Sequence, residues 1–287
     1  MTRRNLFPTV AAFALFASAA FACPAFAAPI HVFGSSSQYG TIESETGAYT
    51  NIGRLTDSFN GASIPLSGFA FGADNNLYGV TGIDGSGANG EGNYLWRFNP
   101  DTGVSTDRRD LPIPLVTIAR RPSDGRLFGY TADADTGNAA VYSFDTTTFA
   151  PTFVGTTDVI TTGALTFDNS SRLYLADSFN GNVYRVDTGN AQTQLFSETG
   201  VANITGAAVV GNTLELFSTD GRTRFRVEAD GSFSPAGTYD IGGGDPGDLI
   251  FGAAIAPFAV IPEAGSGVLL LGAVSLGWWT TRRVRRS

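Results

Sequence analysis

The middle of the chain repeats a unit of about 45 residues, and this period constrains the fold more than any other feature. A small residue followed by an apolar run begins each unit, at Gly68, Thr117, Gly163, Gly206 and Gly252, so that successive units lie 49, 46, 43 and 46 residues apart. In the first four units, Leu and an aromatic residue follow nine or ten residues later, and a third apolar run precedes a turn that contains Asp.

The unit that begins at Gly163 shows the pattern most clearly. Three short strands are predicted at Gly163–Phe167, Arg172–Ala176 and Asn182–Val186, separated by turns rich in Asp, Asn, Ser and Gly. A weaker fourth strand closes each unit, as at Pro151–Val154. Four strands in about 45 residues is the period of a β-propeller blade.

The two ends of the repeat region complement each other. The unit at Gly252 stops after its first strand, while the N-terminal part supplies strands at Ile30–Phe33, Tyr39–Ile42 and Tyr49–Leu55. We therefore predict an all-β, five-bladed β-propeller over residues 28–259, with its last blade closed by N-terminal strands and one C-terminal strand. Closure of the ring would remove open sheet edges, and a sandwich would not explain the divided fifth unit.

Composition excludes several kinds of chemistry. All 18 basic residues are Arg, His31 is the single histidine, and Cys23 is the single cysteine. A lysine Schiff base, a cysteine nucleophile after removal of a leader and a multi-histidine metal site are thus excluded. Residues 28–259 hold 12 of the 18 Arg and 25 of the 26 acidic residues, a difference of −13, which disfavours nucleic acid as a partner.

The N-terminus has the layout of a secretory signal peptide over residues 1–27. Arg3 and Arg4 precede an apolar stretch, Leu6 to Ala22, and Ala25-Phe26-Ala27 is an A-x-A site for signal peptidase. The segment predicts export, by the general secretory route or by a twin-arginine route, and both routes stay open. The signal lies outside the predicted fold.

The C-terminus has three parts, over residues 260–287. Pro262-Glu263-Ala264 precedes 18 uncharged residues, 264–281, which would span ~27 Å as a helix, enough for a thin bilayer. A basic end follows, made of Arg282, Arg283, Arg285 and Arg286. We predict a transmembrane helix outside the fold, with the arginines kept in the cytoplasm and the propeller on the other side.

This tail resembles the PEP-CTERM sorting signal of Gram-negative bacteria, with Ala264 in place of the final Pro of the motif. The resemblance implies processing by a membrane-embedded exosortase, removal of the tail, and delivery to the cell surface or the extracellular polysaccharide matrix. The expected localisation is therefore transient anchoring in the inner membrane followed by surface or extracellular release. An exopolysaccharide is the partner that this destination suggests.

The loops between predicted strands fall into two groups. Turns after the first and third strands are short, and their acidic residues are typical turn formers. Loops after the second strand and links between blades are longer, and DSFNG occurs in both kinds, at 57–61 and 177–181. We predict that these longer loops share one face and form an acidic rim, with Asp57, Asp84, Asp133, Asp135, Asp177, Asp245 and Asp248 as candidate binding residues.

Three functions are compatible with this rim. The first is a non-enzymatic interaction or structural role at the surface, with no cofactor. The second is a module that binds calcium or polysaccharide, in which the alternate carboxylates Asp133 and Asp135 are the calcium candidates. The third is a carboxylate-based glycoside hydrolase, which needs two acidic residues facing the central funnel. His31 falls in a strand and is interpreted as a packing residue rather than a base.

Overall fold

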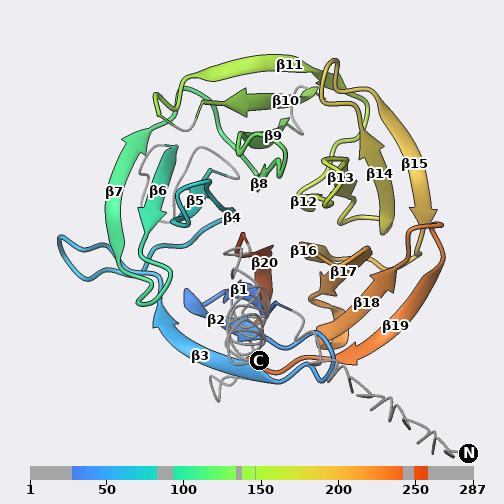
Figure 1. The fold of residues 1–287 in the computed structure, drawn as a ribbon, viewed down its shortest axis with the longest axis horizontal. Coiled ribbons are helices and arrows are strands. Elements are labelled where there is room, and N and C mark those ends of the chain that lie inside the picture. Colours follow the sequence, from blue (N-terminus) through green and yellow to red (C-terminus); the bar gives the residue numbers. More distant parts are fainter. Residues whose placement is uncertain (1–27, 83–92, 134–137, 146, 242–248, 258–287) are drawn as a thin grey trace, which may run out of the picture.

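In the computed structural model, which describes residues 28–82, 93–133, 138–145, 147–241 and 249–257, five four-stranded antiparallel sheets stand around a central axis. Figure 1 shows the first strand of each blade nearest the axis and the fourth strand at the circumference. The all-β, five-bladed propeller predicted from the repeat is confirmed.

Four blades are continuous in sequence. Blade 1 is β4 (Gly68–Phe71), β5 (Leu77–Thr81), β6 (Tyr94–Phe98) and β7 (Ser105–Asp110). Blade 2 is β8 (Thr117–Arg120), β9 (Leu127–Asp133), β10 (Asn138–Phe144) and β11 (Pro151–Thr157). Blade 3 is β12 (Ala164–Phe167), β13 (Leu173–Ala176), β14 (Asn182–Val186) and β15 (Thr193–Glu198). Blade 4 is β16 (Ile204–Val210), β17 (Thr213–Ser218), β18 (Thr223–Val227) and β19 (Phe233–Thr238).

Blade 5 is built from both ends of the described chain, in the order β20-β1-β2-β3. Its strands are β20 (Ile250–Ile255), β1 (Ile30–Gly34), β2 (Gln38–Ile42) and β3 (Tyr49–Arg54). The innermost pair is antiparallel, with Val32 opposite Ala253 and Phe33 opposite Gly252. The predicted closure of the last blade by N-terminal strands and a C-terminal strand is therefore confirmed.

Apolar side chains fill the spaces between neighbouring blades. One cluster joins blades 2 and 3 through residues such as Phe128, Tyr130 and Leu175, and others join the remaining pairs in the same way. Blade packing is close where a strand begins with a small residue: a Cβ on Gly68 of blade 1 would lie 2.6 Å from the Cα of Thr117 of blade 2. The small residue that starts each repeat is thus a packing requirement.

The only helix among the described residues is a short 3-10 turn, η1 (Asp220–Arg222). None of these residues forms a helix long and apolar enough to cross a membrane. The predicted signal peptide, 1–27, and the predicted sorting tail lie outside the described residues, including Pro262, Glu263, Ala264 and the arginines that follow.

Candidate functional site

The two DSFNG segments adopt the same loop. Asp57 Oδ1 accepts a hydrogen bond from the Phe59 amide at 2.9 Å, and Asp177 Oδ1 accepts one from the Phe179 amide at 2.9 Å. In each loop the terminal Gly amide also donates to the carbonyl oxygen of the same Asp, at 2.8 and 2.9 Å. Both glycines have the left-handed φ that this turn requires, 70° and 73°. Both aspartates therefore hold their own turns.

The two loops occupy different surroundings. The loop at 177–181 joins β13 to β14 and contacts the links on either side: the Ser178 amide donates to Thr161 Oγ1 at 2.8 Å, and the Asn203 amide donates to the Ser178 carbonyl at 2.6 Å. Second-to-third loops and blade links thus share a face here, as predicted. Asp177 is only 5% exposed, which leaves its carboxylate little access to a ligand.

The other copy lies at the circumference of blade 1. Outer strands run along the edge of the ring (Figure 1), so the link after β3 contacts the start of β7. There Thr56 forms a β-bridge with Val104, and the Ser58 amide donates to Ser105 Oγ at 2.9 Å. Blade 2 lies between the Asp57 loop and the Asp177 loop in the ring. These two members of the predicted rim are not brought together.

Five further residues belong to the predicted rim. Asp84, Asp135, Asp245 and Asp248 lie outside the described residues, and Asp133 ends β9 with its side chain outside them as well. The calcium candidates Asp133 and Asp135 therefore stay a prediction. Within the described part of the chain, no group of three or more His, Cys, Asp or Glu side chains could hold a metal ion.

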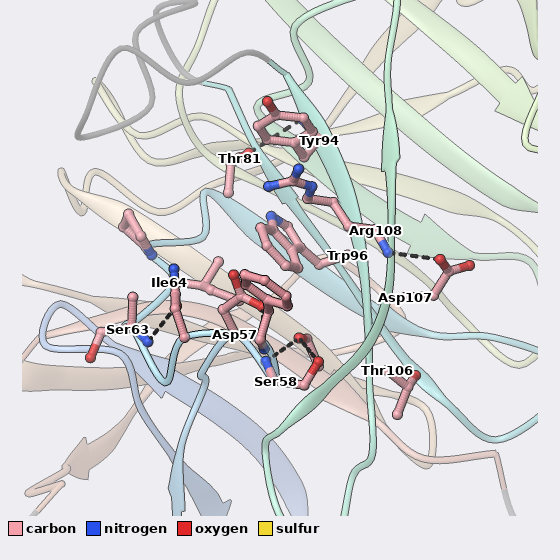
Figure 2. Close-up of a pocket in the computed structure, with 15 residues that line it drawn as sticks. Asp57, Ser58, Ser63, Ile64, Thr81, Tyr94, Trp96, Thr106, Asp107 and Arg108 are labelled. Carbon is pink, nitrogen blue, oxygen red and sulfur yellow. Dashed lines mark hydrogen bonds between the residues drawn. The ribbon is translucent and has the colours of Figure 1, made fainter.

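A cavity of about 420 Å³ separates the link that follows β3 from the outer half of blade 1. Figure 2 shows the residues that line it, contributed by this link and by β5, β6 and β7. Its lining is Asp57, Ser58, Phe59, Asn60, Ala62, Ser63, Ile64, Pro65, Thr81, Tyr94, Trp96, Ser105, Thr106, Asp107 and Arg108. Aromatic, hydroxyl, amide and charged groups thus meet in one hollow, which offers both apolar surface and hydrogen-bonding partners to a ligand.

Two aromatic rings and a guanidinium form one wall of this cavity. The rings of Tyr94 and Trp96 lie 6.1 Å apart on β6, and the guanidinium of Arg108 on β7 lies 4.5 Å and 5.3 Å from their centroids. Trp96 is 5% exposed, and its indole N–H has no acceptor among the described residues. A buried donor without a partner is costly, so this wall presents an unsatisfied hydrogen-bonding group.

The sequence pattern predicts one residue of this site. Asp57, a predicted binding residue, lines the cavity, but its carboxylate caps the loop. The pattern does not predict a role for Tyr94, Trp96 or Arg108, because an aromatic third strand is common to the blades. One signal was present: Trp96 is the only tryptophan outside the segment 264–281.

The central channel is narrow, and most of the residues that line it are apolar types. Its cavity measures about 70 Å³ and is lined by residues of the inner strands, among them Phe71, Phe167 and Ile255, with Arg120 as the charged member. No Asp or Glu from the described ranges lines it. The carboxylate pair that the glycoside hydrolase hypothesis requires is therefore not found in this part of the funnel. Burial in this channel lowers the pKa of Arg120.

His31 packs beside the channel wall. Its Nδ1 lies 2.8 Å from the hydroxyl of Tyr39, and its ring meets the edge of Phe71 at 4.8 Å. Burial lowers the pKa of His31 to about 4, against the opposing effect of the charge on Asp101. The imidazole is therefore neutral at physiological pH, in an environment that suits packing.

None of the family models compared with the chain matches it, and neither does any curated protein. Its fold matches 614 chains of solved structures. One belongs to the crystal structure of a nidogen/laminin complex; it is 13% identical, with a TM-score of 0.51, over 79% of this chain and 98% of that one. At this identity the likeness concerns the fold alone, and it agrees with the propeller seen in the strand pairing.

Proposed function

We propose that this protein is an exported, non-enzymatic propeller that binds glycan through the cavity on the outer edge of blade 1. The observation that carries the proposal is the wall formed by Tyr94 and Trp96, placed among hydroxyl, amide and guanidinium groups. Sugar rings combine apolar C–H faces with hydroxyl groups, so they need both aromatic surface and dispersed hydrogen-bonding partners. The cavity volume falls within the roughly 300–1,000 Å³ of small-molecule sites.

The sequence is consistent with glycan binding outside the cell and with a non-enzymatic role. The expected signal peptide and sorting tail would deliver the propeller to the cell surface or to an extracellular polysaccharide matrix. The chain has no lysine and a single histidine, whose pKa of about 4 makes it a poor base at neutral pH. The similar solved chain belongs to a protein complex, which is in line with a binding role for the fold.

The repeated loop supplies a matched test of glycan binding. Phe59 is 95% exposed at the edge of the cavity, while Phe179 occupies the same position of the same loop on blade 3 and is 67% exposed. The full-length chain, purified in mild detergent, would be applied to an array of microbial and plant polysaccharides. Phe59→Ala should weaken retention by about tenfold, the effect of losing one aromatic contact, whereas Phe179→Ala should retain wild-type binding.

The outcomes of this test are distinct. Equal loss in both variants would show that the exposed aromatics act without the cavity, and no retention of the wild-type chain on any polysaccharide would reject the glycan proposal. Thermal unfolding of both variants is the control for folding, since exposed side chains contribute little to stability.

Sorting by an exosortase-type enzyme is tested separately. Replacement of both Pro262 and Glu263 by Ala should leave the chain in the membrane fraction, because the processing enzyme would lose its recognition motif. The matched control replaces Ser266 by Ala, inside the uncharged segment and beyond the motif. Release of the double variant at the wild-type rate would contradict the assignment of the tail, without bearing on the cavity.

A further inference from the structure

The charged side chains that line the cavity on blade 1 differ in their hydrogen-bond and ion-pair partners. Asp57 caps its own loop through the Phe59 amide. Asp107 accepts the Arg108 amide at 2.9 Å through Oδ1, and its Oδ2 lies 3.4 Å from Arg109 Nε. Among the described residues, the Arg108 guanidinium has no hydrogen bond or ion pair with a carboxylate. Arg108 is therefore the one cation among the described residues that line the cavity, and no described carboxylate pairs with its guanidinium.

The position of Arg108 leaves the N–H groups of its guanidinium available to bind a ligand. Its guanidinium carbon lies 4.5 Å and 5.3 Å from the ring centroids of Tyr94 and Trp96, whose planes are inclined by 69° to each other, so aromatic contact rather than a described counter-ion holds it. The N–H groups of a guanidinium lie in its plane, in a fork that fits the two oxygens of a carboxylate. Contact with the two rings thus restricts the guanidinium to the cavity wall, which reduces the conformational entropy lost when an anion binds.

A second group on the same wall also needs a partner. The Trp96 indole N–H has no acceptor in the described part of the structure, although the side chain is 95% buried. Arg108 covers this ring, so an anion that draws the guanidinium outward by a small movement would open the indole to an oxygen of the same ligand. The fitting ligand therefore carries a carboxylate beside further oxygen acceptors.

We propose that this site selects acidic glycans, with the carboxylate of a uronic acid residue paired to Arg108 and a neighbouring sugar oxygen accepting from Trp96. This inference rests on the glycan-binding function proposed above and names the class of sugar. The rest of the domain opposes such a ligand, since residues 28–259 carry 25 acidic residues against 12 arginines. Arg108 is thus the residue that decides between attraction and repulsion of an acidic chain.

Polygalacturonate and alginate, each compared with its methyl-esterified form, are the probes for this proposal. Esterification keeps the sugar backbone and removes the charge. The full-length chain in mild detergent should bind the acidic forms about ten- to hundredfold more tightly than the esters, the range expected for a hydrogen-bonded ion pair. Arg108→Gln should lose this preference and favour the esters, because only the repulsive field of the domain remains. Arg108→Lys should keep part of it.

Arg126 is the matched control. It precedes β9 on blade 2, its side chain is 56% exposed, and it lies 3.8 Å from Asp124, away from the residues that line the cavity. Arg126→Gln changes the net charge by the same amount as Arg108→Gln, so it should leave the preference for acidic forms within about twofold. An equal effect of the two variants would overturn the role of Arg108 and indicate a general charge effect.

Trp96→Phe probes the indole N–H while keeping an aromatic ring, and it should weaken binding of the acidic forms about three- to tenfold, the worth of one hydrogen bond. Unchanged affinity would remove Trp96 from the proposal.

If the wild-type chain bound acidic and esterified forms equally, the acidic selectivity would be rejected, while the glycan-binding proposal would stand. Binding of neutral polysaccharides alone, without binding of the acidic or esterified forms, would also reject the acidic selectivity and keep glycan binding. Binding of no polysaccharide would reject both glycan binding and the acidic selectivity.

Discussion

Single aspartates in this protein act first on their own backbone. Asp57, Asp177 and Asp187 each accept the amide two residues ahead, at 2.9, 2.9 and 2.7 Å. Backbone hydrogen bonds from Thr148 and Thr147 lower the pKa of Asp145, and hydrogen bonds from the side chain and then the backbone of Ser232 lower the pKa of Asp230. The acidic character of the loops therefore follows largely from turn formation, and an acidic residue in a varied loop is no sign of a ligand by itself.

Asp177→Ala should destabilise the protein by about 1 kcal/mol, the usual cost of losing a side-chain cap of this kind. Asp177→Asn keeps an oxygen acceptor at the same place and should stay within about 0.5 kcal/mol of the wild type. Urea unfolding of the two variants measures both values. Equal destabilisation would show that the negative charge, rather than the hydrogen bond to Phe179, matters.

The stability of the protein should fall between pH 6.5 and pH 4 because of His31. The pKa of His31 lies at about 4 in the folded protein and at its ordinary value of 6.5 in the unfolded chain. In this window the unfolded chain binds the extra proton, so the free energy of unfolding decreases as the pH falls, by up to about 3 kcal/mol. Urea unfolding at pH 7, 5.5 and 4.5 measures this decrease.

His31→Gln should flatten this pH dependence. The pKa of carboxyl groups such as Asp145 and Asp230 is lowered from the ordinary 3.8, so the stability that they contribute starts to fall only as the pH approaches the lower end of this window. A variant with the wild-type slope would show that another group causes the decrease.

At the scale of elements, a buried ionic cluster joins blade 4 to blade 5. Glu215 on β17 and Arg224 on β18 are 0% and 1% exposed, and Arg226 lies 3.2 Å from Glu215. Both arginines donate to the carbonyl oxygen of Ser44 at 2.8 Å, and the Ser44 hydroxyl donates to Glu215. Burial lowers the pKa of Arg224, while the charge of Glu215 opposes this effect. The β2–β3 turn is thus fixed to the neighbouring sheet.

Glu215→Gln should destabilise the protein by about 3–5 kcal/mol, because it leaves two arginines near a buried site without their counter-charge. The control is Asp124→Asn, which breaks an exposed pair with Arg121 and should cost less than about 1 kcal/mol. Urea unfolding at pH 7 compares them. Equal values for the two variants would mean that the cluster is not a stabilising contact between blades.

At the scale of the whole molecule, the ring depends on one strand pair formed between distant parts of the chain. β20 supplies the inner strand of blade 5, and Ile250 is fully buried there. Without β20, the sheet of β1, β2 and β3 would expose an inner edge, and blade 4 would lose its neighbour near the axis. The closing pair therefore links the stability of every blade to the two ends of the domain.

A chain that ends at residue 249 should lose the closing strand and with it about 5 kcal/mol of buried apolar contact. For a domain of this size that loss corresponds to a fall of ~10–20 °C in Tm. The control is a chain that ends at residue 257 and keeps β20. Calorimetry of the two, each beginning at residue 28, measures the difference; identical Tm values would show that closure adds nothing.

The architecture was predictable because it is repeated. Turn aspartates, small residues at strand starts and apolar strands recur at each blade, so an ambiguous signal in one unit is supported by the others. The divided fifth unit then predicted the closure that pairs Phe33 with Gly252. The candidate site was predicted only through Asp57, since nothing in the periodic pattern separates Tyr94 and Trp96 from the aromatic residues of other third strands.

The amino-acid sequence suffices to predict the local structure and the number of blades. The two DSFNG loops form the same hydrogen bonds at Asp57 and Asp177 in different surroundings, because turn geometry depends on neighbours in the chain. The fold is needed to show that one copy is enclosed between links while the other borders a cavity with Trp96 and Arg108. One copy is a hairpin loop inside a blade and the other is a link between two blades, so strand pairing around the ring brings different segments, distant in sequence, against each of them (Figure 1).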